Sequence, residues 1–533
     1  MGSAVEPELS NATAGGGRHA AHVAAGILVT RVLGYVRQRV FAHYFGNGAA
    51  ADAFGAALRI PNAIRNLLGE GTLSASFIPV YAALDQKNKP AARALAGAIL
   101  GLLLLASGIL AVLGIAFAPA ITALVAQGFD WSRRELTTIL VRILFPMTGL
   151  MVVSAWCLGV LNTHRRFFLP YAAPALWNIA GIAAMVGAAT WVAGRGLPAS
   201  EQLYRLSLAL AWGTVAGSVL QIAIQMPTCW RLLHGVPLRA SLAPEGVRQV
   251  ITAWTPLVIG AGVAQLSGLV DTFLGSYTGV GGLASLGYAQ LVQVLPISMF
   301  GASVTAVALP DLSRDAIAEH AHEKLRTRIA LGFRRIAFFV IPSAFAFAAL
   351  GPQIIAALFQ TGRFDSEDAV LVGGVLAAYS IGLLGQSTVR LFASGFYAMR
   401  DTRTPVRIAI VSLVMSTLLS WFFMRRLGPA GIAFGSSIAW TFNTVLHLYD
   451  LDKRIGAILQ RTDWRTLVLI VVAALIAALL SMAADRLVAG IRPVLRGIAV
   501  LGIFGIAYGA LTLAFRHPDA IRAWQSLIGW LAR

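Results

Sequence analysis

Seven ionisable side chains interrupt two apolar segments between Thr30 and Pro79. They are Arg31, Arg37, Arg39, Asp52, Arg59, Arg65 and Glu70. An ionisable group inside a bilayer costs a few kcal/mol or more unless it faces a polar cavity and has a partner, so such groups mark functional sites. The chemistry that five arginines offer here is anion binding, because the planar guanidinium donates two parallel hydrogen bonds to a carboxylate or a phosphate.

The spacing of these residues predicts a polar lining on two neighbouring helices. Asp52 and Arg59 are seven residues apart, so they share one face of a continuous helix. Asp52 and Glu70 are expected to orient the arginines and to limit the net charge of an empty cavity, with Arg37 and Arg65 binding the anion. Arg39 lies near an end of its segment, where a long side chain reaches water. The predicted substrate-binding set is Arg31, Arg37, Asp52, Arg59, Arg65 and Glu70.

The elements that position this set must be membrane-spanning helices. Of the 533 residues, 57% are hydrophobic and 12% are charged, and the mean hydropathy is +0.74. Apolar runs of about 20 residues match a hydrocarbon core of about 30 Å, whereas a β-barrel needs short alternating segments. The predicted fold is therefore an all-α polytopic membrane protein with fourteen transmembrane helices.

The basic residues predict an orientation and not a nucleic-acid partner. The net charge is +19, but the lysines and arginines are scattered among short loops. In the fourteen-helix arrangement, 25 of the 42 lie on the side that holds both termini and 10 on the other side. The positive-inside rule then places both termini in the cytoplasm. The two cysteines, Cys157 and Cys229, are expected to be small buried residues without a disulfide.

A faint internal repeat predicts two lobes. Pro61, Gly71 and Pro79 echo Pro296, Gly301 and Pro310, and the segment from Gly159 to Pro170 echoes that from Gly395 to Pro405 at an offset of about 235. Two six-helix lobes related by a pseudo-two-fold axis along the membrane normal would enclose a cavity, as in transporters that work by rocking. The predicted parts are a disordered tail over 1–19, an N-lobe over 20–228, a linker over 229–249, a C-lobe over 250–453, and two further helices with a tail over 454–533. Pro237 favours a loop for the linker.

Catalytic signatures do not accompany these features. The sequence contains no phosphate-binding loop of the G-x-x-x-x-G-K-[ST] type, no H-E-x-x-H motif and no Cys/His cluster, so we expect neither an enzyme nor a metal site. Asp271 is isolated in the seventh predicted helix and is a candidate proton or cation site. For the hydroxyl groups near it in the predicted bundle there are two interpretations: they join this site, or they form packing contacts between helices. We expect no cofactor beyond a coupling cation or the membrane potential.

The motif-like stretches resemble the MurJ (MviN) family of lipid II flippases, in the multidrug/oligosaccharidyl-lipid/polysaccharide exporter superfamily. The resemblance covers almost the whole chain. It rests on Thr30–Arg37, Ala51–Phe54, Arg59–Arg65, Gly69–Pro79, Ala308–Arg314, Leu358–Phe364 and Gly395–Pro405. It implies a bacterial inner-membrane flippase that moves undecaprenyl-diphosphate-linked peptidoglycan precursor (lipid II) to the periplasmic leaflet for cell-wall biogenesis. It also implies a groove for the polyprenyl tail at the last two helices, and functional roles for Arg31, Arg37, Asp52 and Arg65.

Three positions depart from the family pattern. Gln38 stands where an aspartate is common, Asn66 where a second arginine is common, and Leu291 where helix eight usually carries an arginine. These departures keep two alternatives open, an exporter of another polyprenyl-linked glycan and a transport-dead scaffold that binds cell-wall synthesis proteins. A membrane enzyme acting on polyprenyl phosphates is a further alternative, and it would need acidic catalytic loops that the sequence lacks.

Overall fold

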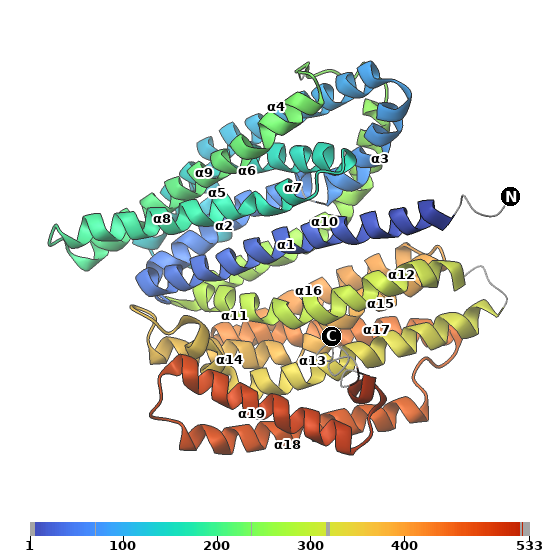
Figure 1. The fold of residues 1–533 in the computed structure, drawn as a ribbon. Coiled ribbons are helices and arrows are strands. Elements are labelled where there is room, and N and C mark those ends of the chain that lie inside the picture. Colours follow the sequence, from blue (N-terminus) through green and yellow to red (C-terminus); the bar gives the residue numbers. More distant parts are fainter. Residues whose placement is uncertain (1–5, 70, 236, 316–319, 523–524, 526–533) are drawn as a thin grey trace. The chain divides into compact units, whose positions relative to one another are not determined.

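The computed structural model describes residues 6–69, 71–235, 237–315, 320–522 and 525, so Glu70 of the predicted set lies outside the described residues. The described chain forms two compact units, Met1–Phe273 and Leu274–Arg533, and Figure 1 follows it from blue to red. The boundary between them falls inside one helix. The predicted lobes are defined by repeat symmetry, and they stay a prediction.

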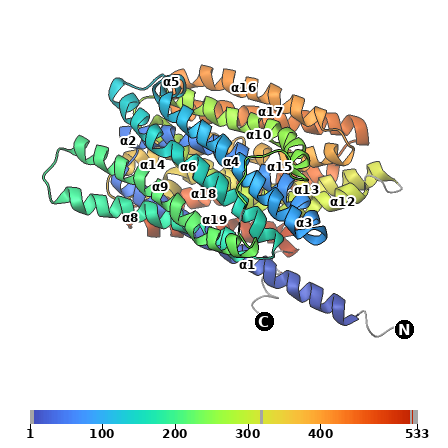
Figure 2. The same ribbon diagram turned by 90° about the horizontal axis from the view of Figure 1, so that it is seen from above.

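The first unit is built from helices joined by short turns. They are α1 (Glu6–Phe45), α2 (Ala49–Leu68), α3 (Thr72–Lys87), α4 (Lys89–Ala116), α5 (Ala118–Val125), α6 (Trp131–Thr163), α7 (Phe168–Ala172), α8 (Pro174–Ala193), α9 (Ala199–Leu232) and α10 (Val247–Ser276), of which α10 enters the second unit in its last turn. Helices α8 and α9 lie side by side in both ribbon views (Figures 1 and 2).

The second unit is also built from helices. Its helices are α11 (Gly282–Pro296), the π-helical turn η1 (Ile297–Ala302), α12 (Ser303–Asp315), α13 (Ala321–Phe359), α14 (Ser366–Ser380), α15 (Leu383–Ala398), α16 (Arg403–Leu427), α17 (Pro429–Ile455), α18 (Arg461–Leu487) and α19 (Pro493–Ala514). Among the described residues, the only isolated β-bridge joins Thr361 and Phe364.

The helical fold and the membrane assignment are confirmed. Eleven helical stretches among the described residues are long and apolar enough to cross a membrane, and helices satisfy every backbone polar group within the segment. The long helices α1, α10 and α17 are not among these eleven, so the predicted number of fourteen is not confirmed.

The N-terminus differs from the sequence expectation. Helix α1 begins at Glu6 and runs unbroken to Phe45, so residues 6–19, predicted to be a disordered tail, belong to its first turns. Proline is absent from this stretch after Pro7, so a helix started in the apolar segment can extend backwards, although the three consecutive glycines Gly15 to Gly17 are poor helix formers.

The core of the first unit lies between α3, α4, α6 and α9. Phe77, Tyr81, Leu95 and Trp156 are fully buried there, and the Trp156 indole donates a 3.0 Å hydrogen bond to the carbonyl of Ala96.

The segment after α9 is non-helical, as Pro237 predicted, and it crosses α4 at two glycines. A Cβ on Gly97 would lie 2.1 Å from the Pro237 carbonyl oxygen, and one on Gly101 would lie 2.7 Å from that of Arg239.

The second unit packs its last two helices against α13. Helices α18 and α19 lie along α13 in Figure 1. The Tyr508 hydroxyl of α19 donates a 2.7 Å hydrogen bond to the carbonyl of Phe338 in α13. At the far end of α19, Arg496 holds Asp485 of α18 with two hydrogen bonds of 2.6 and 2.8 Å. The C-terminal pair of helices is therefore part of the second unit.

The backbone at the ends of α6 and α15 bears on the predicted repeat. Helices α6 and α15 end in the same hydrogen-bond pattern, with Arg166 N bonded to Leu161 O and Asp401 N bonded to Phe396 O. The residue before each of these two donors, Arg165 and Arg400, adopts a positive φ of 56° and 61°. This is a Schellman-type helix end, and the two copies are 235 residues apart. Helices α9 and α19 end in the same way, with Gly235 N bonded to Trp230 O and His517 N bonded to Thr512 O, so the pattern does not distinguish the repeat and the repeat stays a prediction.

Candidate functional site

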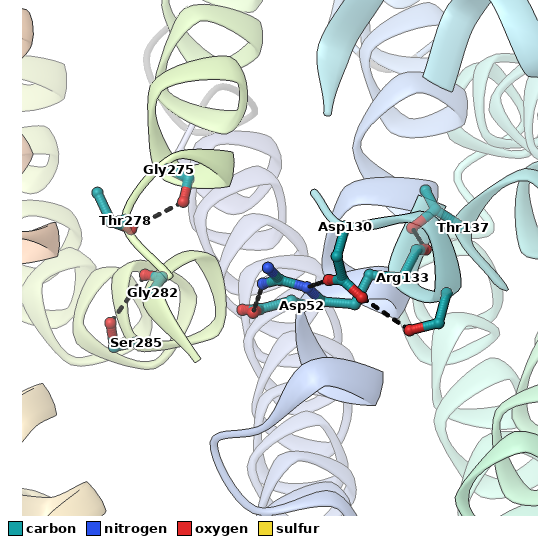
Figure 3. Close-up of polar contacts among 9 residues, drawn as sticks. Asp52, Asp130, Arg133, Thr137, Gly275, Thr278, Gly282 and Ser285 are labelled. Atoms are coloured by element: carbon teal, nitrogen blue, oxygen red, sulfur yellow. Dashed lines mark hydrogen bonds and ion pairs between the residues drawn. The ribbon is translucent and has the colours of Figure 1, made fainter. Parts of the chain in front are cut away.

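A buried ion pair joins α2 to α6 (Figure 3). Asp52, in the first turn of α2, has no exposed surface, and its Oδ2 lies 3.3 Å from Nη1 of Arg133 in the first turn of α6. The Nε of Arg133 also donates to Asp130, and its guanidinium stands 4.8 Å from the centre of the Phe129 ring. A buried carboxylate with a buried arginine partner is the arrangement that membrane interiors require.

Arg133 was not among the predicted site residues. The charged run from Asp130 to Glu135 predicts a loop at Arg133, whereas α6 already begins at Trp131. Asp52 was expected to orient Arg37 and Arg65, whereas the structure gives it Arg133 as an ion-pair partner. The signal that could have found the pair is the run itself, since an acidic residue directly before a helix favours its N-terminus.

Asp130 precedes α6 and lies outside the membrane-spanning segment. Hydrogen bonds from the side chains of Arg133 and Ser132 lower the pKa of its carboxyl to about 2. Asp130 therefore stays ionised at any physiological pH and supplies Arg133 with a second anionic partner. At the Asp52 end of the site Arg133 is thus bonded to two carboxylates, those of Asp52 and Asp130.

A polar seam runs between α2 and α10. Arg59 Nε donates a 3.2 Å hydrogen bond to the carbonyl of Gly268, and Asn66 Nδ2 donates a 3.3 Å hydrogen bond to Oε1 of Gln265. The residue numbers rise along α2 and fall along α10, so the two helices run antiparallel at the seam. A Cβ on Gly268 would lie 2.8 Å from an Arg59 terminal nitrogen, so the arginine would have to shift if a larger residue stood there.

Arg65 and Asp271 belong to the same seam. The Arg65 Nη2 donates a 3.4 Å hydrogen bond to Oδ1 of Asn66, which in turn bonds α10. Asp271 lies three residues after Gly268, on the face of α10 that meets α2, and Arg59 is the charge that acts on it. The seam therefore holds Arg59 and Arg65 of the predicted set, and Asp271 lies one turn from the Gly268 whose carbonyl Arg59 contacts.

Arg37 lies in a different environment, between α1 and α8. Its guanidinium carbon stands 4.3 Å from the centre of the Trp177 ring, and its aliphatic stem passes Gly181. Its Nε is buried without a hydrogen-bond partner among the described atoms. Stacking on the tryptophan face holds the cation while leaving donors unused.

Two further arginines of the stretch from Thr30 to Pro79, Arg31 and Arg39, also lie on α1. Arg31 is exposed on α1, one position after Thr30, whose hydroxyl donates a 2.9 Å hydrogen bond to the carbonyl of Tyr171. Arg39 is half-buried. Within the described residues, no group of three or more His, Cys, Asp or Glu side chains could hold a metal ion.

The three departures from the family pattern take distinct places. Asn66 bridges Arg65 to Gln265, so an amide performs an interhelical contact at this position. Gln38 is half-buried on α1. Leu291 is 46% exposed on α11, which leaves that surface of the second unit apolar.

Comparison with known proteins identifies the family. The family model described as "Lipid II flippase MurJ" matches residues 41–493. The lipid II flippase MurJ of Burkholderia cenocepacia is 34% identical over 460 residues, covering 85% of this chain and 86% of its own. A probable lipid II flippase MurJ of Vibrio cholerae is 30% identical over 457 residues, covering 83% and 84%.

Solved structures agree on the fold. A lipid II flippase MurJ in an inward closed conformation is similar with a TM-score of 0.76 at 22% identity, covering 94% of this chain and 99% of its own. An inward-facing multidrug resistance transporter of the MATE family, in the MOP superfamily, is similar with a TM-score of 0.63 at 20% identity, covering 80% and 94%. The chain is therefore a multi-pass membrane protein that belongs to the lipid II flippase MurJ family.

Proposed function

We propose that this protein translocates lipid II, the undecaprenyl-diphosphate-linked peptidoglycan precursor, from the cytoplasmic to the periplasmic leaflet of the bacterial inner membrane by alternating access. Family membership and relatives named lipid II flippases support this substrate. No bond is made or broken in the proposed reaction, so the protein acts as a transporter and not as an enzyme. Both termini face the cytoplasm in this proposal.

The observation that carries the proposal is the α2–α10 seam with its arginines. The Nε of Arg59 donates a hydrogen bond to the Gly268 carbonyl, and neither of its Nη groups has a partner among the described residues. Arg65 is held by one long hydrogen bond of 3.4 Å, and its Nε is buried without a partner. Arginines fixed in place with unused donors, within apolar helices, are suited to a diphosphate that arrives with its own charge.

The other site residues have roles in the same proposal. Arg37, stacked on Trp177, and Arg31 extend the cationic surface along α1 toward the headgroup. Asp271, next to Arg59, is the proposed site for a coupling cation or proton, because it balances the arginine when no substrate is bound. Glu70, outside the described residues, keeps its predicted place in the set. The groove for the polyprenyl tail is assigned to α18 and α19.

Leaflet-resolved detection of lipid II tests the proposal. Cells depleted of their own flippase and expressing this protein are expected to expose lipid II on the periplasmic face and to grow. Arg37→Ala and Arg65→Ala are expected to abolish both, while membrane insertion persists. Growth of both mutants at the wild-type rate would contradict the site assignment.

The same experiment separates the alternatives. Absence of periplasmic lipid II with the wild-type protein well expressed would contradict lipid II as the cargo. Flipping of a different polyprenyl-linked glycan would then identify an exporter, whereas rescue of growth without any flipping would identify a scaffold of the cell-wall synthesis machinery.

A further inference from the structure

The ring of Trp177, in α8, carries the guanidinium of Arg37. The guanidinium carbon stands 4.3 Å from the ring centre, which is within the distance at which an aromatic face attracts a cation. Trp177 is uncharged, so it is not in the predicted substrate-binding set, which contains only ionisable side chains. The contact nevertheless decides where one of the two arginines assigned to the diphosphate is held.

The inner part of the Arg37 side chain is enclosed by α8. A Cβ on Gly181 would lie 3.4 Å from the Cδ of Arg37, so the arginine stem passes α8 at a residue that has no side chain. The Nε of Arg37 is buried, whereas the residue as a whole is half-buried. A change of rotamer near the guanidinium would therefore have to break the stack on Trp177.

Helix α8 is also bonded to α1 beside this stack. Asn178, which follows Trp177, is 5% exposed, and its Nδ2 donates a 3.4 Å hydrogen bond to the carbonyl of Thr30. Thr30 lies seven residues before Arg37 and therefore on the same face of α1. The two helices thus meet over two turns, and both partners of the stack lie in this contact.

Helix α9 supports the backbone of Trp177. A Cβ on Gly217 would lie 2.8 Å from the Cα of Trp177 and 3.0 Å from the Cβ of Ala180, so the close approach of α9 to α8 requires glycine there. The two helices lie side by side in Figures 1 and 2. Since both α1 and α9 hold α8 at this level, the indole is a fixed platform for the arginine.

We infer that Trp177 is a positioning residue for substrate binding, which holds the Arg37 guanidinium ready for the diphosphate of the lipid-linked substrate. The inference rests on the proposed function, in which Arg37 binds this diphosphate. An arginine that is free to rotate loses side-chain entropy when it binds an anion, and a stack that already fixes the guanidinium removes part of that cost. Trp177 thus raises the affinity for the diphosphate through Arg37.

A double-mutant cycle on the purified full-length protein in detergent tests this role. Binding of undecaprenyl diphosphate and of undecaprenol is measured by native mass spectrometry. Trp177→Leu is expected to weaken undecaprenyl diphosphate binding about tenfold, the order that a desolvated cation–π contact contributes, and to leave undecaprenol binding unchanged. In the Arg37→Gln background the same substitution is expected to have little further effect, because the cation that Trp177 positions is gone.

Two further variants on α8 complete the test. Trp177→Phe keeps a weaker aromatic face and is expected to lose less diphosphate affinity than Trp177→Leu. Trp191→Leu is the matched control, because Trp191 also stacks with an arginine, Arg195, whose guanidinium carbon lies 3.7 Å from the ring centre. Trp191 is 45% exposed near the end of α8, and its variant is expected to bind both lipids like the wild type.

Wild-type diphosphate affinity in Trp177→Leu would overturn the inference. An equal loss in the wild-type and Arg37→Gln backgrounds, or an equal loss toward undecaprenol, would also overturn it, because Trp177 would then act through the fold and not through Arg37. Melting temperatures show whether each variant is folded, and if Trp177→Leu is not, Trp177→Phe takes its place in the cycle. Failure of the wild type to bind undecaprenyl diphosphate would contradict the proposed function itself.

Discussion

Asp52 and Arg133 illustrate how single residues decide this site. Both are buried, and the 3.3 Å contact between them links two helices that are 81 residues apart in the chain. The pair is asymmetric, because Arg133 has Asp130 as a second partner whereas Asp52 is fully enclosed. Loss of one member of a buried pair leaves an uncompensated charge, which costs about 3–5 kcal/mol in soluble proteins.

Arg133→Gln is therefore expected to destabilise the protein more than Asp52→Asn. The first variant leaves the enclosed carboxylate of Asp52 without this cation, whereas the second leaves Arg133 bonded to Asp130. The thermal unfolding temperature of the purified protein in detergent measures this order. The double variant should lose less than the sum of the single losses. A larger loss for Asp52→Asn would show that Asp52 does more than balance Arg133.

Asp130 gives the same cluster a pH dependence. Its pKa is about 2 in the folded protein against 3.8 ordinarily. A lowered folded pKa contributes stability above pH 3.8, and that contribution is lost as the pH falls from 3.8 to about 2. The unfolding temperature of the wild type should fall over this window more steeply than that of Asp130→Asn, which has no such carboxyl to protonate. Parallel curves for the two proteins would contradict this assignment.

The elements are held by close backbone approaches that only small residues allow. The segment after α9 lies across α4 at Gly97 and Gly101, where an added Cβ would meet the backbone of that segment. The non-helical segment is therefore fastened to the first unit. A Schellman-type end recurs at α6 and α15, and at the second copy Asp401 caps α16 by accepting hydrogen bonds of 2.9 and 3.0 Å from two backbone amides.

Gly97→Ala is expected to destabilise the first unit, because its methyl group would meet the Pro237 backbone and that contact must open. Overpacking of this kind costs about 1–3 kcal/mol. Gly108→Ala, on the same helix, is the control, since a Cβ there meets nothing within 4 Å, and it is expected to be neutral or stabilising. Expression level and unfolding temperature in detergent check both. Equal behaviour of the two variants would contradict the packing of this segment.

At the scale of the whole molecule, the charges outside the helices predict the topology. The excess of lysines and arginines lies on the side that holds both termini in the fourteen-helix arrangement, and short basic loops are retained in the cytoplasm. The family match over residues 41–493 and the eleven apolar helical stretches agree with a multi-pass protein.

Reporter fusions measure this topology. Green fluorescent protein at either terminus is expected to fluoresce, and alkaline phosphatase at either terminus is expected to be inactive, because both termini are predicted to be cytoplasmic. A phosphatase fused in the turn between α8 and α9, at Gly196, should be active, since that turn lies on the opposite side in the predicted arrangement. Active phosphatase at one terminus would require an odd number of spans.

The sequence by itself determined the all-helical membrane fold, the family and the arginines in apolar helices. Such features are local: hydropathy over 20 residues and a charge inside an apolar run are visible without knowing what lies beside them. The Pro237 loop follows from local backbone chemistry in the same way. The family resemblance identifies Asn66 and Leu291 as departures from the family pattern. It does not show which residues these two side chains contact.

Only the tertiary structure decided the partners. Asp52 pairs with Arg133, Arg59 bonds the backbone of Gly268, and Arg37 stacks on Trp177, each across a distance in sequence that no spacing rule covers. The physical reason is that the face a helix buries is chosen by the other helices packed on it, and that choice is a property of the folded chain.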